Sequence, residues 1–400
     1  MRKQLSQKQY AALSSKITKI SNKIDVVSSE LNNAFLEKSV EIESLIIGVI
    51  ANENVCLVGP AGEGKSGLAE AFTSLIGGSN CFKYQVNAYT QPDNVFGTES
   101  LKELVNNDRK ILKTGNMAPE ADIVYLDECF KANNSMMNAL LLLLNEREVD
   151  IGEGQRVKTN NRMVIGSSNE YPEDDDLKAF WDRWVIRCHV AAPKKDSSFV
   201  DLFSKYGDGS IGVVDVKNGM KLTEIDAMRS SVEHVDLSLL KDVIIQLRFE
   251  LMKNGITLST RRWVKLFKII AAVSIRKGRL QAQKEDVKFL KNCIWNIESE
   301  REVVDQCIMD AVGGDLKAAK QLLQVAERIY AEVKGANLKD NTQTIVVVAP
   351  KMDDLKVLCA DAMKLDRTDA AVDHTVFQII QIQKAVAQVL SDAVNNQTRR

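Results

Sequence analysis

The stretch from Gly59 to Ser66 constrains the fold of this chain more than any other feature. It reads GPAGEGKS and fits the pattern G-x-x-x-x-G-K-[ST] in full. An apolar run of strand type precedes it and a segment with helical spacing follows it, so the glycines fall on a strand-to-helix turn. Backbone amides on such a turn can surround a phosphate, and the helix N-terminus faces the anion. The sequence therefore predicts a phosphate-binding loop within an α/β fold.

Two side chains at the end of this stretch have predicted roles toward a nucleotide. Lys65 would neutralise charge on the β- and γ-phosphates, and the Ser66 hydroxyl would bind Mg²⁺. A glycine-rich turn without a ligand is the alternative, but the flanking strand and helix argue against it. The residues predicted to bind the nucleotide are Gly59, Pro60, Ala61, Gly62, Glu63, Gly64, Lys65, Ser66 and Gly67.

The composition is that of an ordinary soluble protein. Its 400 residues are enough for two or three domains. The 53 basic residues balance 54 acidic ones, so the charge gives no reason to invoke nucleic acid as a partner. No apolar run is long enough to span a membrane, and the first residues are polar, so we expect no export. Seven cysteines without a C-x-x-C pair indicate reduced thiols, and we expect a cytoplasmic protein.

Alternating strand-like and helical segments indicate a doubly wound α/β domain over residues 38–192. Within it, residues 91–114 have turn residues at both ends and look like an insertion, and residues 148–158 read as a hairpin with glycines at its turn. Residues 193–236 are poorly patterned and are interpreted as a connector. Residues 237–299 have helical spacing throughout, which predicts a small all-α lid.

Three heptad seams lie outside this core. One occupies residues 1–37, and the tail, residues 300–400, contains two more. They predict a three-helix bundle formed by residues near 8–35, 315–334 and 373–394. The alternative is that each seam packs separately on the lid or the core. Between the last two helices, residues 344–349 (TIVVVA) read as a lone strand closed by Pro350, which could pair at a sheet edge here or in another chain.

Polar residues follow two of the predicted strands. Asp127 and Glu128 end a buried strand, where Asp127 can bind Mg²⁺ and Glu128 can activate the attacking water. A surface acidic pair is the alternative interpretation. Asn169 closes the following strand, and its amide could orient the same water; an Asx turn is the alternative there. This set predicts a nucleotide hydrolase rather than a small-molecule kinase.

Two pairs of arginines are candidates to contact phosphate. Arg183 and Arg187 lie near the end of the α/β domain, where an arginine reaching a γ-phosphate across a subunit boundary would stabilise the transition state. The alternative is that the arginine forms an ordinary surface ion pair with a nearby acidic residue. Arg261 and Arg262 open a lid helix, and a cation in that first turn opposes the helix dipole, which suggests a ligand for it.

Taken in order, the motifs GPAGEGKS, IVYLDE, SSNE, WDR and STRRW resemble those of AAA+ ATPases of the MoxR family, most closely its RavA branch. The resemblance covers about residues 38–300 and includes runs such as TQPDNVFGTESLKEL and SSNEYPEDDDLKAFWDRWVIR. It implies a parallel sheet with flanking helices followed by an all-α lid, in a ring usually of six subunits with ATP between neighbours. RavA also has a triple-helical domain, which favours the predicted bundle. The tail shows no sign of the β-rich domain through which RavA meets its lysine decarboxylase partner, so that partner is not transferred.

The resemblance also implies a role for each motif residue. These roles are Walker A for Lys65 and Ser66, Walker B for Asp127 and Glu128, sensor 1 for Asn169, arginine finger for Arg183 and sensor 2 for Arg261. Arg187 and Arg262 are the weaker candidates for the last two roles. Residues 91–114 and 148–158 match the helix-2 insert and the pre-sensor 1 hairpin, which this clade points toward the pore of the ring.

Three functions fit these observations. The first is an ATP-driven, chaperone-like machine that acts on a protein client with a von Willebrand factor A (VWA) type partner. The second is a nucleic-acid motor, which the neutral charge and the few basic residues of the inserts argue against. The third is a nucleotide-gated scaffold, in which ATP sets assembly and hydrolysis only resets it.

Overall fold

The computed structural model describes residues 6–172, 175–335, 341–365, 367 and 370–398. The chain divides into two compact units. One comprises Met1–Asp242 and Asn254–Asp305, and the other comprises Val243–Lys253 and Gln306–Arg400. The predicted nucleotide site lies entirely in the first unit.

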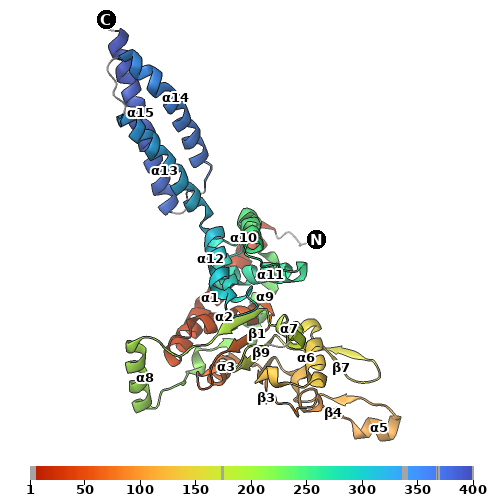
Figure 1. Ribbon diagram of the computed structural model, residues 1–400. Coiled ribbons are helices and arrows are strands. Elements are labelled where there is room, and N and C mark those ends of the chain that lie inside the picture. The colour runs from red at the N-terminus through yellow and green to blue at the C-terminus, as the bar shows by residue number, and fades with distance from the viewer. Residues whose placement is uncertain (1–5, 173–174, 336–340, 366, 368–369, 399–400) are drawn as a thin grey trace. The chain divides into compact units, whose positions relative to one another are not determined.

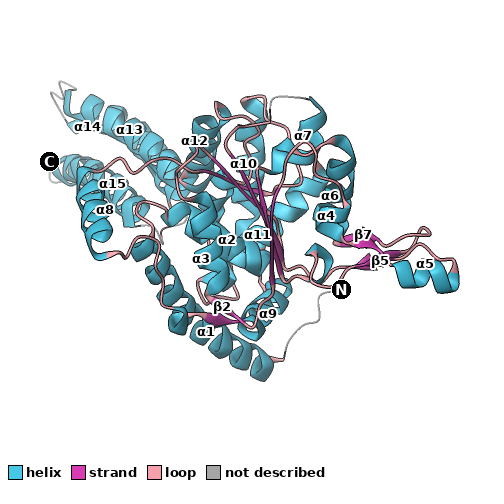
Figure 2. Cartoon of the chain, turned by 90° about the horizontal axis from the view of Figure 1, so that it is seen from below, coloured by secondary structure: helices cyan, strands magenta, loops and turns pink. Residues whose placement is uncertain are grey.

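A five-stranded parallel sheet forms the centre of the first unit (Figure 1). Its three central strands are almost continuous buried runs, mostly apolar, as expected where helices cover both faces. The strand order is β10 (Ile186–His189), β1 (Val55–Val58), β9 (Met163–Ser168), β6 (Ile123–Asp127) and β3 (Cys81–Gln85). Figure 2 shows the sheet edge-on, with α2 (Ser39–Ala51) and α3 (Lys65–Ser74) on one face and α6 (Asn134–Glu146) on the other. The predicted α/β core is confirmed.

Two insertions extend from this core beside each other (Figures 1 and 2). The first holds α4 (Asp93–Phe96) and the antiparallel pair β4 (Thr98–Glu99) and β5 (Leu112–Lys113), with α5 (Leu101–Asn107) between the strands. The second is the hairpin of β7 (Glu148–Asp150) and β8 (Arg156–Lys158). The Leu112 amide donates to the Ile151 carbonyl at 2.8 Å, and Arg109 pairs with Glu153 at 3.2 Å. These contacts join the two insertions.

The N-terminal helix α1 (Gln7–Ala34) packs on the core, so the prediction that it joins the C-terminal helices is wrong. Its seam is buried as the heptad pattern indicates, but the partners are α2, α9 (Leu222–Ser231) and α11 (Thr260–Arg276). Ser21 donates to the Arg276 carbonyl at 2.6 Å, and Asp25 accepts from the Arg276 guanidinium at 2.7 Å. A heptad seam specifies which face of a helix is buried and leaves the choice of partner to contacts such as these.

The predicted connector is more regular than its pattern indicates. It holds α8 (Asp196–Asp208), α9 and a two-residue strand, β11 (Met220–Lys221), which pairs in parallel with β2 (Ile76–Gly77). The predicted lid range holds α10 (Lys241–Lys253), α11 and the 3₁₀ helix η6 (Lys284–Asn292), and α12 (Glu300–Val312) follows.

The second unit contains a bundle of three long helices, α13 (Gly314–Gly335), α14 (Asn341–Ala362) and α15 (Ala370–Thr398). The prediction of a strand at 344–349 is wrong, since this segment is the start of α14. Its β-branched residues favour a strand locally, but Val348, Leu355 and Cys359 recur at helical spacing and are buried in the bundle core. Pro350 lies within the helix on an exposed position. Helix α14 therefore takes the place in the bundle that the sequence analysis gave to the N-terminal helix.

Within the described part of the chain, no helix is both long enough and apolar enough to cross a lipid bilayer.

Candidate nucleotide site

The predicted phosphate-binding loop lies between β1 and α3 and depends on its glycines. A Cβ at Gly59 would lie 2.0 Å from the Val190 carbonyl oxygen, so the close approach of β10 requires glycine there. Gly62 and Gly64 have φ values of +89° and +78°, in the left-handed region that favours glycine. The loop therefore keeps a backbone path that other residue types would strain.

Lys65 is buried at the start of α3, and its ammonium group folds back over the loop. It donates to the carbonyls of Gly59 and Pro60 at 2.6 and 2.7 Å and to Oδ1 of Asn169 at 2.8 Å. Burial lowers the pKa of Lys65, while the nearby Glu128 carboxylate opposes that shift. The charge predicted to meet the phosphates is thus fixed in place by the loop itself.

The sheet order explains how Asn169 reaches both halves of the site. Its strand, β9, lies between β1, which precedes the loop, and β6, which ends in Asp127. The Asn169 amide oxygen accepts from Lys65, and its amide nitrogen donates to Glu128 Oε1. One side chain therefore joins the predicted Walker A lysine to the predicted general base, which the Asx-turn alternative would not do.

Glu128 is held in an unusual conformation directly after β6. Its φ of +54° is in the left-handed region, and its residue is 8% exposed. Besides Asn169, the Glu128 carboxylate meets Lys131 at 3.4 Å. A left-handed backbone conformation is strained for a residue other than glycine and persists only when the surrounding structure holds it. Such conformations are typical of functional positions.

Hydroxyl groups link the two predicted Mg²⁺ ligands. The Tyr125 hydroxyl donates to Ser66 Oγ at 2.9 Å and lies 2.8 Å from Ser167 Oγ, and Ser167 donates to Asp127 Oδ1. Burial raises the pKa of Tyr125 to about 12, so its hydroxyl is protonated at neutral pH. The sequence analysis missed Tyr125 and Ser167, although a tyrosine inside the otherwise aliphatic run before Asp127 was a visible signal.

The oxygen atoms of Ser66 and Asp127 suit a magnesium ion. Mg²⁺ prefers oxygen ligands and is usually held by one or two protein groups together with water and substrate phosphates. Among the described residues, no group of three or more His, Cys, Asp or Glu side chains is placed to bind a metal without such help. A bound Mg²⁺ would neutralise developing charge on the phosphates.

Residues at the junction of α1 and α2 cover the loop from the other side. The Phe35 ring is the nearest neighbour that a side chain at Gly64 or Gly67 would meet. Lys38 is buried, donates to the Ala191 carbonyl and lies 3.9 Å from Glu63. The sequence analysis assigned no role to Phe35 or Lys38, because their proximity to the loop arises only from the packing of α1 on the core.

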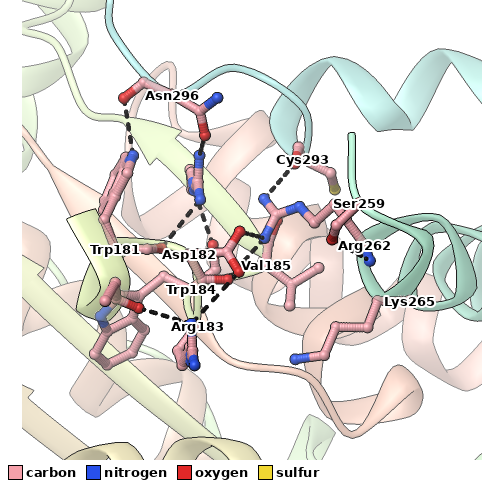
Figure 3. Close-up of polar contacts among 12 residues, drawn as sticks. Trp181, Asp182, Arg183, Trp184, Val185, Ser259, Arg262, Lys265, Cys293 and Asn296 are labelled. Carbon is pink, nitrogen blue, oxygen red and sulfur yellow. Dashed lines mark hydrogen bonds and ion pairs between the residues drawn. The ribbon is translucent and has the colours of Figure 1, made fainter. Parts of the chain in front are cut away.

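The two weaker arginine candidates are structural. Arg187 is fully buried on β10, where it donates to the carbonyls of Trp181, Trp184 and Trp295 and its guanidinium lies 4.4 Å from the centre of the Trp181 ring. Burial lowers the pKa of Arg187 well below its usual range. Arg262 is 4% exposed and donates to the carbonyls of Asp182, Val185 and Cys293, tying α11 to the end of the core (Figure 3). Neither guanidinium is free to meet a phosphate.

Arg183 has a different environment (Figure 3). Its Nη1 donates to the Ala179 carbonyl at 3.1 Å and lies 3.6 Å from the Asp182 carboxylate, and its side chain is partly exposed. Within the described residues, its Nε has no hydrogen-bond partner. Because this Nε is buried, only the partly exposed end of the Arg183 guanidinium could reach another group.

Arg261 is exposed in the first turn of α11, while the cap is made by Ser259, which accepts from the Arg262 amide at 3.2 Å. Its position after an N-cap matches the predicted sensor 2 site in sequence. The described contacts do not bring it to the loop within this chain.

We expect Arg187→Met to lower the stability of the first unit by about 2–4 kcal/mol, because three carbonyls lose a buried donor. For a unit of this size, the melting temperature should fall by roughly 4–10 °C. Thermal unfolding followed by circular dichroism measures the melting temperature of the parent and the variant. The matched control is Arg261→Met, an exposed arginine, which should stay within about 2 °C of the parent. Equal melting temperatures for both variants would contradict the structural role of Arg187.

The phosphate-binding loop follows β1 of a parallel sheet, and an Asp-Glu pair ends β6, which is separated from β1 by β9. This arrangement defines a nucleotide-binding protein of the P-loop class. Comparison with protein families agrees. The family of the MoxR domain in the MoxR-vWA-beta-propeller ternary systems matches residues 22–206, and an AAA lid domain matches residues 239–308.

Individual proteins extend the similarity over most of the chain. Uncharacterized protein MJ0079 of Methanocaldococcus jannaschii is 30% identical over 390 residues, which are 94% of this chain and 100% of that protein. Uncharacterized protein MJ0812 of the same organism is 32% identical and covers 78% of this chain and 82% of its own length. The crystal structure of a candidate ATPase from Cytophaga hutchinsonii has a TM-score of 0.60 at 18% identity and covers 74% of this chain and 97% of that chain, which shows a shared fold. The chain belongs to the MoxR family of AAA+ ATPases. The finer assignment to the RavA branch stays a prediction.

Proposed function

We propose that this chain hydrolyses Mg²⁺-ATP and uses the energy to remodel or assemble protein clients. The observation that carries the hydrolysis is the position of Asn169, which contacts both Lys65 and Glu128. It places a carboxylate at the phosphate-binding loop, where Glu128 can act as general base on the attacking water. Ser66 and Asp127 hold the cation, and Lys65 stabilises charge on the phosphates.

The proposal includes assembly into a ring, with six subunits as the number that the family resemblance implies, and the environment of Arg183 supports a site shared between subunits. Within one chain the described contacts bind the Arg183 guanidinium only to the Ala179 carbonyl and to Asp182. A neighbouring subunit could bring the Arg183 guanidinium to the γ-phosphate, where such an arginine stabilises transition-state charge. Arg261 would reach the nucleotide as sensor 2 when the lid closes over it.

The two joined insertions are the proposed contact with a protein client. Leu101 and Val105 lie one turn apart on α5 and are 76% and 80% exposed, and Val157 on the hairpin is also exposed. Exposed apolar side chains on a projecting element suit transient contact with an unfolded or partly folded chain. The matched family is described in systems with vWA proteins, which supports a VWA-domain protein as partner.

The insertions do not favour a nucleic-acid motor. Of their cationic residues, Arg109 pairs with Glu153 at 3.2 Å and Arg156 with Glu146 at 3.5 Å. Lys110 lies 4.0 Å from Glu99. Acidic partners beside these cations weaken the uncompensated positive patch that binding to phosphate backbones requires.

The proposal predicts that ATP controls the mass of the protein in solution. Light scattering after size exclusion should give a multiple of the chain mass in ATP, with six chains as the expected number, and a smaller species without nucleotide. The Lys65→Ala variant is the control, because it removes the charge that holds the phosphates and should stay small in ATP. Parent-level turnover by a species of one chain would contradict ring assembly.

Capture of partners tests the remodelling role separately. The Glu128→Gln variant with ATP should retain clients, and the proteins that co-elute can be identified by mass spectrometry. Turnover of the parent should then rise when a captured client or VWA-domain protein is added. Turnover that ignores every captured protein would favour the nucleotide-gated scaffold instead.

A further inference from the structure

Tyr125 lies at the centre of the candidate site without a role in the proposed chemistry. It is 1% exposed on β6, two residues before Asp127, so both side chains point to the same face of the sheet. A buried hydroxyl costs free energy unless it forms hydrogen bonds. The Tyr125 hydroxyl has two oxygen neighbours, Ser66 Oγ at 2.9 Å and Ser167 Oγ at 2.8 Å.

The protons available to this chain of hydroxyls limit how it can be ordered. Each hydroxyl carries one proton, and an ionised carboxylate only accepts. The Ser167 hydroxyl donates its hydrogen bond to the Asp127 carboxylate. The contact between Tyr125 and Ser167 is then a hydrogen bond only if Tyr125 donates, and Tyr125 must in turn accept from Ser66. If Tyr125 instead donates to Ser66, the contact between Tyr125 and Ser167 has no proton.

The fully bonded order has a consequence for Ser66. A serine that binds a cation does so through an oxygen lone pair, so its proton must point elsewhere. Tyr125 is the acceptor within reach on the buried side. The order Ser66 to Tyr125 to Ser167 to Asp127 therefore directs the Ser66 proton into the protein and leaves its lone pairs for the cation.

We propose that Tyr125 is a positioning residue that accepts a hydrogen bond from the Ser66 hydroxyl when Mg²⁺ binds and, through Ser167, couples Ser66 to Asp127. The oxygen positions permit either donor direction between Tyr125 and Ser66, because hydroxyl protons rotate, and a cation on Ser66 selects the direction from Ser66 to Tyr125. The relay makes the two cation ligands interdependent although they lie on different elements, α3 and β6. This inference rests on the proposed function, because it assumes that Ser66 and Asp127 hold Mg²⁺.

Tyr125→Phe tests the relay with little change in packing, because only one oxygen is removed. The measurement is the affinity for a fluorescent ADP analogue, taken with Mg²⁺ and again with EDTA. We expect the Mg²⁺-dependent gain in affinity to fall about tenfold, since Ser66 loses the acceptor for its proton. Affinity in EDTA should stay within about twofold, which also shows that the loop is folded. The matched control is Tyr84→Phe on β3, which removes the same atom from a ring stacked on Phe82 and should change neither value.

The outcomes separate this inference from the proposed function. Ser66→Ala should abolish the Mg²⁺-dependent gain, and if it does not, the assignment of the cation site fails and the relay with it. If Ser66→Ala abolishes the gain while Tyr125→Phe leaves it intact, the relay alone is wrong. Equal losses by Tyr125→Phe with Mg²⁺ and with EDTA would mean that Tyr125 only packs, which also overturns the proposal.

Ser167→Ala tests the second link. It breaks the relay beyond Tyr125 and should also reduce the Mg²⁺-dependent gain. Because both changes interrupt one chain, the double variant Tyr125→Phe/Ser167→Ala should lose little more than the larger single effect. Losses that multiply in the double variant would show two independent contacts and contradict a relay.

Discussion

Glu128→Gln should bind ATP with nearly parent affinity and lose turnover by roughly 10²–10⁴-fold, the usual contribution of a general base. The change keeps the size of the side chain and an oxygen that can accept from the Asn169 amide. It removes the carboxylate that would take a proton from the attacking water. Because the residue is buried beside Lys65 and Asn169, bulk water or buffer cannot easily replace it.

Phosphate release and binding of a fluorescent ATP analogue measure the two effects separately. The matched control is Glu170→Gln, the same substitution one residue after Asn169 on an exposed position. Glu170→Gln should hydrolyse ATP at the parent rate. Parent-level turnover in Glu128→Gln would show that another group activates the water, and the role given to Glu128 would then be wrong.

The local parts of the site could be predicted because short motifs fix them. The glycine spacing, a buried run ending in Asp127 and Glu128, and a second run ending near Asn169 each have a clear sequence signal. Parallel strands present their carboxyl ends at one edge of a sheet, so the meeting of these residues could be expected from the α/β pattern. The strand order then explains why Asn169 touches both Lys65 and Glu128.

Long-range packing could not be predicted in the same way. The heptad seam of α1 identified the buried residues from Ile17 to Ala34, but a seam is compatible with any apolar groove, and here α2, α9 and α11 form that groove. The segment TIVVVA has strand propensity over six residues, yet the helical repeat of buried positions through Val348 and Leu355 continues beyond it. Burial over the whole of α14 outweighs propensity in one part of it.

The arginine pairs show a further limit. Arg183 and Arg187 are the same residue type four positions apart. Sequence alone ranks them as arginine-finger candidates only by family resemblance. The structure separates them by burial and by the carbonyls around Arg187, one of which comes from Trp295, far away in the sequence. The same applies to Arg261 and Arg262. In each pair the buried arginine, Arg187 or Arg262, has a structural role.

Arg183→Ala should lower ATP turnover by about 10³–10⁵-fold, the range for an arginine that stabilises the transferred phosphoryl group. The reason is that the developing charge on the γ-phosphate loses a cation supplied by the next subunit. Affinity for ADP should change little, since the charge that Arg183 meets is that of the γ-phosphate. Steady-state turnover and binding of a fluorescent ADP analogue measure the two quantities. A turnover close to the parent's would return Arg183 to the role of a surface ion pair with Asp182.

Mixing two inactive variants decides whether Arg183 acts between subunits. Glu128→Gln binds ATP and retains Arg183 but lacks the general base, and Arg183→Ala retains Glu128. If the guanidinium acts across the boundary, rings that contain both variants will have some sites with an intact Glu128 facing an intact Arg183, and turnover will reappear on mixing. If Arg183 acts on its own chain's nucleotide, every site in a mixed ring lacks one of the two groups and the mixture stays inactive. Recovery of turnover on mixing therefore requires a site formed by two subunits. A loss of rate in a single variant could not establish this.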